Sequence, residues 1–299
     1  MQTMLSQAQR QQFADEFRRR LAHVEELPAL PEAAMELLAL RNHPQADVKD
    51  LVSIISRDPG VSAQVLRYGR LSIFGYGERI QTVENAVTLV LGYEKALYLT
   101  LGLAVGNSLT MQADGPLGRR EFWRHSFTSA ILCQTLAQAM PKQQQPNADM
   151  AYLSGLLHDI GSMLIGYLYP REFAMLNVLV ERYYDQEPRE LELLSLGISH
   201  DMIGLHLMRT WNMPEELLVA IGEHHFPEYG GKHSAYCKLV YLSNYLQRQM
   251  RQPGLAVEER RYVMVRQYLG LDEESVEAAV RMMNQATAEI GQLSEDMAA

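Results

Sequence analysis

The sequence has little cysteine, which excludes one way of holding a fold together. Only Cys133 and Cys237 occur among 299 residues, and both lie in apolar segments with helical spacing. A secreted scaffold held by disulfides is denser in cysteine and usually shorter than this chain. We therefore expect free thiols and a reducing, cytoplasmic environment.

The sequence also lacks any dense cluster of positive charge. Lysine and arginine number 27 against 36 aspartates and glutamates, which gives a formal net charge of −9. The short basic runs FRRR at 17–20 and ERRY at 259–262 are typical of solvated helix faces. Holding a polyanion requires a stronger positive field than these runs supply, so general nucleic-acid binding is not expected.

Long apolar runs are missing as well. The first 21 residues contain no apolar core followed by small residues, so no secretory signal and no export are expected. Residues 96–113 carry no charge, and Gly102 and Gly106 have the spacing of closely packed membrane helices. Polar side chains interrupt this stretch at Asn107, Ser108, Thr110 and Gln112. Spanning a bilayer takes about 20 predominantly apolar residues, so we predict a buried helix and no membrane insertion.

The sequence does contain a pattern of amphipathic helices. Its composition is 47% hydrophobic and 21% charged, which indicates a folded globular chain. Apolar residues recur at intervals of three and four, and no segment alternates like a strand between hairpin turns. The expected fold class is all-α. The main expected helices cover 31–40, 48–56, 83–91, 119–140, 148–168, 171–184, 188–196, 199–211, 214–225 and 233–250, with two more after 256.

Local signals mark several of these helices. Pro31 opens PEAAMELLAL, Asp47 precedes VKDLVSIIS, and Thr82 precedes VENAVTLVL. Aspartate and threonine are favoured as N-caps, and proline is favoured in the first turn. Gly92 follows the last of these segments and predicts its end. The first third of the chain is therefore expected to be short helices joined by tight turns.

Two breaks divide the chain into three expected parts. MQADGPLG at 111–118 follows the uncharged helix, and RQPGLA at 251–256 precedes the last two helices. We expect an N-terminal helical subdomain at 1–115, a helical core at 116–250 and a C-terminal extension at 251–299. The extension carries methionine and leucine on one helical face, which makes it a candidate partner or dimer surface.

Histidines are concentrated in the second part of the chain. Seven of the nine lie between 125 and 233. Imidazole and carboxylate groups suit divalent metals, and a helical protein must collect such ligands from several helices. Adjacent residues of a helix point about 100° apart, so His158 and Asp159 can reach one ion only if the helix turns the edge between these two side chains toward it. The alternative is that each histidine is a hydrogen-bonded core residue, since a lone buried imidazole needs only one partner per nitrogen.

The ordered motifs carry a resemblance to a known family. They are LPALPEAAMELLAL, DVKDLVSIISRDPGVSAQVLR, ENAVTLVLG, EFWRHSFTSAILCQTLA, AYLSGLLHDIGSMLI, GISHDMIGLHLMRTWNMPEELLVAIGEHHFPE and KLVYLSNYL. Together they resemble an HDOD domain, a bacterial output module of the HD superfamily, over about residues 20–250. The resemblance implies an N-terminal helical subdomain packed on a degenerate HD-type core, and a signalling role without catalysis.

The resemblance also implies a ligand set. The positions that match the metal-binding pattern of HD phosphohydrolases are His125, His158, Asp159, His200, His224 and His225. Asn244 stands where the pattern has its last aspartate, and an amide oxygen contributes no negative charge to a divalent site. His206 and His233 do not match the pattern and are expected to be surface or core residues.

Three further departures bear on activity. Ser162 replaces a lysine that follows HDIG in many cyclic-dinucleotide phosphodiesterases, which removes a cation facing phosphate. The stretch after His225 reads FPEYGGKH and has no GYP signature. Arg70 and Leu71 replace an Asn-Ser pair common in HDOD loops.

Three functions remain open on the sequence. The leading hypothesis is a non-catalytic signalling module that acts through contacts with other signalling proteins. The alternative is a metal-dependent phosphohydrolase acting on a nucleotide or cyclic dinucleotide, with bound metal activating water. A third is a sensor that binds a metal or small ligand without turning it over. The metals considered are Fe, Mn, Mg and Zn.

Overall fold

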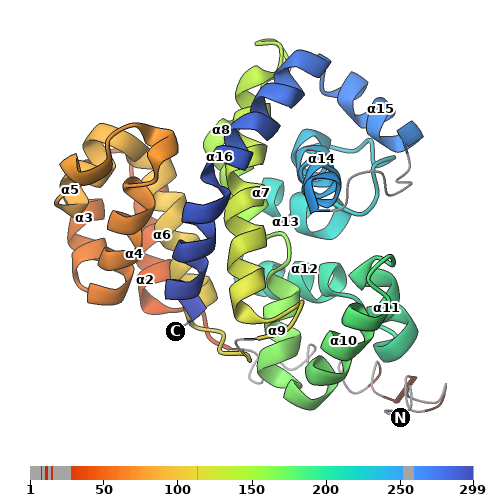
Figure 1. Ribbon diagram of the computed structural model, residues 1–299. Helices are drawn as coiled ribbons and strands as arrows, with labels where there is room; N and C mark the ends of the chain where they lie inside the picture. The colour runs from red at the N-terminus through yellow and green to blue at the C-terminus, as the bar shows by residue number, and fades with distance from the viewer. Residues whose placement is uncertain are drawn as a thin grey trace.

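The computed structural model describes residues 8, 11, 12, 15, 28–112, 114–251 and 259–298. Within these residues every regular element is a helix, which confirms the all-α class expected from the apolar spacing (Figure 1). The basic run FRRR and most of the RQPGLA break lie outside the described residues. No described helix combines the length and apolarity needed to cross a bilayer.

The N-terminal part is a group of short helices ahead of one long buried helix. Their bounds are α2 (Glu32–Arg41), α3 (Val48–Ser56), α4 (Pro59–Gly69), η2 (Ser72–Phe74), η3 (Gly77–Arg79), α5 (Val83–Asn85), η4 (Ala86–Leu91) and α6 (Tyr93–Asn107). Asp47 caps α3 by accepting from two backbone N–H groups, and Asp50 returns the bond to complete a capping box. Thr82 caps α5. The sequence signals for these two starts are confirmed.

The expected single α-helix at 83–91 is wrong in its second half. After α5 the chain forms the π-helix η4, and the N–H of Gly92 donates to the carbonyl of Val87, five residues back, at 2.8 Å. Ala86, Val87 and Leu91 are all buried in this wider turn. Apolar spacing alone does not separate the two helix types, because both bring residues four apart to about the same face.

The uncharged stretch forms the buried helix α6, as predicted. A Cβ at Gly106 would lie 2.5 Å from the ring of Trp123, and one at Gly102 would collide with Leu156. Small residues therefore let α6 pack closely against the following helices, inside the protein rather than in a membrane. Residues 108–118 join α6 to the next helix without helical structure in the part described.

The second part surrounds one long central helix. Its helices are α7 (Arg119–Ala139), α8 (Ala148–Leu157), α9 (Ile160–Leu168), α10 (Pro170–Arg182), α11 (Pro188–Leu196), α12 (His200–Thr210), α13 (Glu215–Glu223) and α14 (Ser234–Arg251). Helix α7 packs on α8 and α14, α9 packs on α12, and α13 packs on α8 and α14. Apolar residues from Ala34 to Met297 form one continuous core, which joins this part to the N-terminal helices.

The C-terminal extension is part of that core. It contains α15 (Glu259–Tyr268) and α16 (Glu273–Ala298), and α16 lies along α7 and reaches α4 and η2 (Figure 1). Its apolar face, including Met283 and Ile290, is buried. The amphipathic pattern therefore predicted a partner surface wrongly, because the chain covers this face itself.

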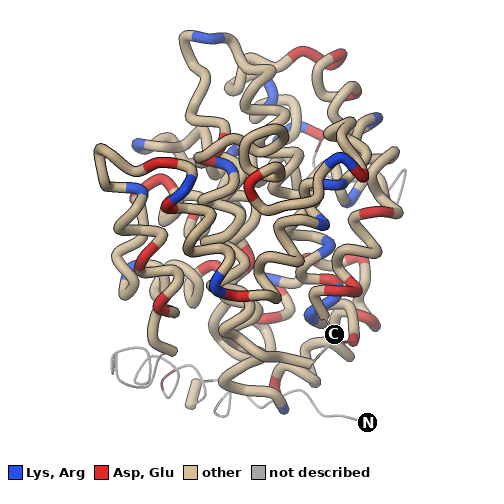
Figure 2. The backbone as a smooth tube through the Cα atoms, turned by 90° about the vertical axis from the view of Figure 1, so that its left-hand side faces the viewer, with Lys and Arg blue, Asp and Glu red and all other residues tan. Residues whose placement is uncertain are grey.

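Charged residues of both signs are interspersed over the described chain (Figure 2). Many are paired, as in Arg57 with Glu36 at 2.7 Å and Arg120 with Glu295 at 2.8 Å. The two signs of charge are therefore mixed along the described chain.

Candidate metal centre

A break in the helix at His158 and Asp159 creates the centre. The sequence predicted one helix over 148–168, but α8 ends at Leu157 and α9 begins at Ile160. Asp159 has φ −98° and ψ 16°, outside the helical region. In an intact helix these adjacent side chains would point about 100° apart. Because the helix is broken here, both His158 and Asp159 face the same cluster of histidines.

Two glycines bring this break close to the other ligand-bearing helices. A Cβ at Gly155 on α8 would lie 2.5 Å from the Ser129 carbonyl on α7, the helix that carries His125. A Cβ at Gly161 on α9 would collide with the carbonyl of His200 at the start of α12. The glycines of GLLHDIG therefore set the distance from His158 and Asp159 to His125 on one side and His200 on the other.

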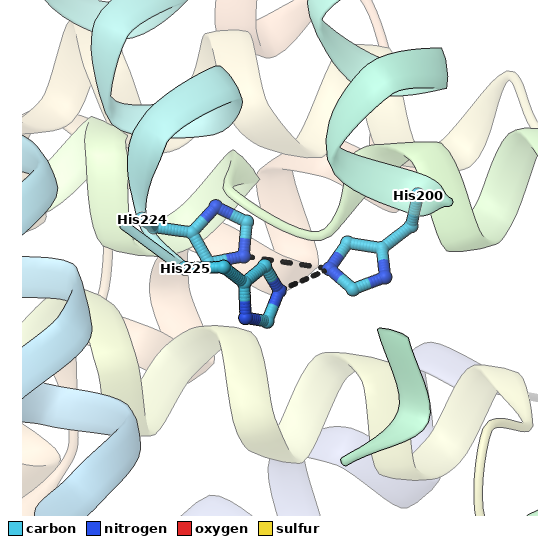
Figure 3. A group of neighbouring side chains, drawn as sticks. All are labelled: His200, His224 and His225. Atoms are coloured by element: carbon cyan, nitrogen blue, oxygen red, sulfur yellow. Dashed lines mark hydrogen bonds between the residues drawn. The ribbon is translucent and has the colours of Figure 1, made fainter. Parts of the chain in front are cut away.

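All six ligand residues predicted from the resemblance meet in this region. They form two groups in which the nearest ligand atoms lie within 4.8 Å of one another. One group is His125, His158 and Asp159, and the other is His200, His224 and His225. Figure 3 shows the second group, in which the His200 ring faces the rings of His224 and His225.

Hydrogen bonds determine the tautomer of four histidines. Each directs Nδ1 at a group that can only accept, so Nδ1 must carry the proton and donate. The acceptors are the Gly155 carbonyl for His158 at 2.9 Å, the Ile221 carbonyl for His224 at 2.8 Å, the Glu192 carboxylate for His200 at 2.7 Å and the Gln247 amide oxygen for His125 at 3.0 Å. When such a ring is neutral, its Nε2 presents a lone pair.

These Nε2 atoms converge on one another. His125 and His158 bring their Nε2 atoms to 3.1 Å, and His200 lies 2.9 Å from His225 and 3.4 Å from His224 through the same atoms. Two lone pairs cannot form a hydrogen bond with each other, so a proton or a metal ion between such rings would stabilise the arrangement. Part of the cluster can also be satisfied by hydrogen bonds alone, since Nδ2 of Asn244 lies 3.3 Å from Nε2 of His158.

Asp159 lies between the two groups and faces both. Its Oδ1 is 3.3 Å from Nε2 of His158, 3.2 Å from that of His200 and 3.5 Å from that of His224. Its Oδ2 is 3.4 Å from Nε2 of His125. Oδ1 thus contacts residues of both groups, and Oδ2 contacts His125 of the first group.

Electrostatics keep Asp159 ionised. Burial would raise its pKa, but His158 and His200 hold the pKa of this carboxyl well below its usual range. Burial would also lower the pKa of His200, whereas Glu192 and Asp159 raise that pKa well above the ordinary value. His200, placed between two carboxylates, is therefore the imidazole that most readily carries a proton.

The other rings favour the neutral form. Burial lowers the pKa of His125 and of His224. Burial and the charge of His224 lower the pKa of His225 well below its usual value. A neutral imidazole is the form that binds metal, so these rings are prepared as ligands near neutral pH.

Asn244 lies beside the first group. Its Nδ2 is 3.3 Å from Nε2 of His158, and its Oδ1 is buried without a hydrogen-bond partner among the described residues. A buried carbonyl oxygen without a partner is costly. Rotation of the Asn244 amide would exchange Nδ2 and Oδ1 and direct the oxygen toward His158. A cation bound there would give this oxygen a partner.

Two residues that hydrogen-bond to the candidate ligands were not predicted from the sequence. Glu192 and Gln247 hold the rings of His200 and His125. Glu192 falls on the buried face of α11 with Ser195 and Leu196, so an acidic residue at an apolar position was an available signal. Gln247 follows Asn244 by three residues on α14, which places both on one helical face.

The remaining predicted positions fall outside the two groups. His233 lies 3.4 Å from Glu215 in a turn, and His206 belongs to neither group. Arg70 donates to the Ile80 carbonyl at 2.7 Å and Leu71 is buried, so this pair holds the loop between α4 and α5. Ser162 is buried in α9.

The HDOD domain profile matches residues 27–227. This match covers more than half of the chain. The chain belongs to the HDOD family. The match includes the six ligand positions and ends before α14, α15 and α16.

Individual proteins are also similar to this chain. The HDOD chain is 27% identical over 206 residues to an uncharacterized protein of Treponema pallidum (strain Nichols), covering 68% of this chain but only 38% of that relative. A solved structure from Marinobacter aquaeolei VT8, described as a candidate signal transduction protein, aligns with a TM-score of 0.80 and 29% identity over 98% of this chain and 66% of the other. A candidate phosphohydrolase from Shewanella amazonensis SB2B shares the fold, with a TM-score of 0.72 and 23% identity over 93% of this chain and 97% of the other.

Proposed function

We propose that this HDOD protein is a signalling module that carries a divalent metal centre, and that it acts by contacts with other signalling proteins. The observation that carries the proposal is the convergence of imidazole Nε2 atoms around Asp159, with four tautomers set by Nδ1 hydrogen bonds. The proposed ligands are His125, His158, Asp159, His200, His224 and His225, with Asn244 at the edge. The similarity to a candidate signal transduction protein supports the regulatory role.

The donor set favours zinc or iron over magnesium. Imidazole suits zinc, iron, copper and nickel, whereas magnesium and calcium take oxygen ligands. Here five imidazoles accompany one carboxylate. Backing of His200 by Glu192 resembles the carboxylate–histidine pairs that orient metal-bound imidazoles.

Charge balance favours regulation over hydrolysis. Asp159 is the one carboxylate in the two described ligand groups, so a divalent ion leaves an excess of positive charge and a second ion increases it. Asn244 adds no charge, and Ser162 adds no cation to direct a phosphate group. A centre of this kind can bind metal, but it is less suited to activating water for phosphoester hydrolysis than a centre with more carboxylates.

Hydrolysis of a phosphoester is the second candidate, and one observation favours it. The carboxylate of Asp159 faces ligand residues of both groups. Two-metal hydrolases use a bridging arrangement of this kind to hold two ions that stabilise the attacking and leaving oxygens. A candidate phosphohydrolase with the same fold is consistent with this reading.

Metal analysis of the purified full chain, with zinc and iron titrations, tests the proposal. We expect bound metal in the wild type, its loss in His158→Ala, and its retention in His43→Ala, which changes an exposed histidine far from the centre. Asn244→Asp should bind metal about tenfold more tightly because it adds a carboxylate. Wild-type protein that neither retains nor takes up metal would contradict the proposal.

A phosphoester panel separates the two candidates. The signalling module should hydrolyse none of a set of nucleotides, cyclic dinucleotides and aryl phosphates, with metal loaded. Turnover that His158→Ala abolishes and His43→Ala leaves intact would establish the second candidate instead.

A further inference from the structure

A pocket lies on the far side of His125 from the metal centre, between α7, α14 and α16. Its volume is about 120 Å³, and its polar lining consists of Arg124, Thr128, Gln247, Arg251, Asn284 and Thr287. Only α7 belongs to the part of the chain that matches the HDOD profile, whereas α14 and α16 follow its end at residue 227. The pocket is therefore a feature of this chain that the family match does not cover.

Positive charge is concentrated in this pocket. Arg124 and Arg251 both line it. Arg124 is paired with Glu121, its Nε lying 3.0 Å from the carboxylate, whereas Arg251 forms no ion pair with any described residue. The two guanidinium groups line the same small cavity, and the Glu121 carboxylate balances only one of their charges. An anion between them would balance the other charge.

The hydrogen-bond donors for an anion in this pocket come from the arginines and the amide. Thr128 and Thr287 donate their hydroxyl protons to backbone carbonyls of their own helices, so they supply no donor to the anion and can only accept from a ligand that carries O–H or N–H groups. Asn284 adds an amide, and it is exposed together with Arg251, so the pocket opens to solvent at that end. Guanidinium groups recognise phosphate and carboxylate through paired N–H donors.

Gln247 connects the pocket with the metal centre. Its side chain is buried, and its Nε2 donates to Ser129 at 2.7 Å and to Ser243 at 3.3 Å. This leaves Oε1 facing Nδ1 of His125 at 3.0 Å. A ligand that contacts Gln247 therefore contacts the group that sets the tautomer of a proposed metal ligand.

We propose that this pocket is an effector site for a small oxyanion, a phosphate group or a compound that carries one, and that Gln247 couples its occupancy to the metal centre. The proposed anion binding depends only on the residues that line the pocket. The proposed coupling depends also on the metal centre proposed above.

Calorimetric titration of inorganic phosphate into the metal-free full chain, at constant ionic strength, tests the binding. We expect saturable binding at one site, weakened at least tenfold in Arg251→Gln. Arg281→Gln removes an arginine of α16 outside the pocket lining and should bind phosphate as the wild type does. His158→Ala should also retain binding, because the anion does not occupy the metal centre.

Three results would overturn the effector site. They are the absence of saturable binding in the wild type, unchanged binding in Arg251→Gln, and loss of binding in His158→Ala, which would place the anion at the metal centre. Circular dichroism of each variant shows whether it is folded. Should Arg251→Gln not fold, Asn284→Ala on the exposed face of α16 takes its place, with binding weakened several-fold.

Zinc titration in the presence and absence of sulfate, a tetrahedral dianion that does not precipitate zinc, tests the coupling. We expect sulfate to change the zinc affinity of the wild type several-fold and to leave that of Arg251→Gln unchanged. By linkage, zinc must change the sulfate affinity by the same factor. An equal zinc affinity in both conditions would overturn the coupling. A wild type that binds phosphate but no zinc would contradict the metal centre and leave the anion site standing.

Discussion

The buried carboxylate of Glu192 holds His200 twice, accepting from its backbone N–H at 2.8 Å and from Nδ1 at 2.7 Å. The first bond caps the start of α12, and the second orients the ring toward Asp159. Arg189 on the same helix pairs with the buried Asp201 at 3.1 Å, so α11 holds the first turn of α12 at two points. The position of one proposed ligand therefore depends on a helix that contributes no ligand itself.

Glu192→Gln should weaken zinc binding by about ten- to a hundredfold, the usual effect of losing a partner behind a metal ligand. The amide keeps the shape but removes the negative charge that polarises His200. Competition with a chromophoric chelator measures the affinity. Glu190→Gln changes an exposed carboxylate on the same helix and should leave it unchanged. Equal affinities for the two variants would show that Glu192 does not orient the ligand.

Gly161→Ala should destabilise the protein by about 1–3 kcal/mol or more, because the added methyl group collides with the His200 carbonyl. The same displacement should lower zinc binding. Gly291→Ala on α16 is the matched control, since its Cβ meets nothing within 4 Å and replacing a helical glycine stabilises by about 0.5–1 kcal/mol. Urea unfolding in the presence of a chelator measures both. A Gly161→Ala protein as stable as the wild type would refute the close approach of α9 to α12.

Stability should depend on pH through Lys95. Its Nζ lies 4.5 Å from the centroid of the Phe74 ring, and burial lowers its pKa from 10.5 to about 8, although Asp149 opposes this. Between these pH values the unfolded chain holds a proton that the folded chain has lost, so the free energy of unfolding rises with pH; below about pH 8 the cost of the buried charge is constant.

Comparison with Lys95→Met isolates this effect, because the titration of cysteines and tyrosines is common to both proteins. The difference in unfolding free energy, wild type minus variant, should rise by about 2–3 kcal/mol from pH 7 to pH 10, at ~1.4 kcal/mol per pH unit above the folded pKa. Lys49→Met at an exposed position should show no such rise. A flat difference for Lys95→Met would mean that Lys95 titrates as it does in water.

Met283→Ala should cost about 2–5 kcal/mol, the range for removing a buried methionine side chain. Met283 is 1% exposed on the face of α16 that contacts the core, whereas Met264 on α15 is 38% exposed. Met264→Ala should change stability by less than about 0.5 kcal/mol. Thermal unfolding of both variants at two protein concentrations checks this. Concentration-dependent unfolding lost specifically in Met283→Ala would instead indicate that this face joins two copies.

The sequence by itself determined the helical class, the helix starts at Asp47 and Thr82, and the residue types available as ligands. These are local properties: capping and apolar spacing act within one or two turns, and ligand types are written in the residues themselves. The motif pattern also predicted six ligand positions, and the structure brings these six residues together.

Only the tertiary structure decided how these residues are arranged. The break at His158 and Asp159 depends on close contacts of Gly155 and Gly161 with other helices, which no local propensity encodes. The same holds for Glu192 and Gln247, whose partners lie 8 and 122 residues away. The sequence pattern of α16 predicted an apolar face but could not show which part of the protein covers it. In the structure this face packs on α7, because burying apolar surface lowers the free energy of the folded chain.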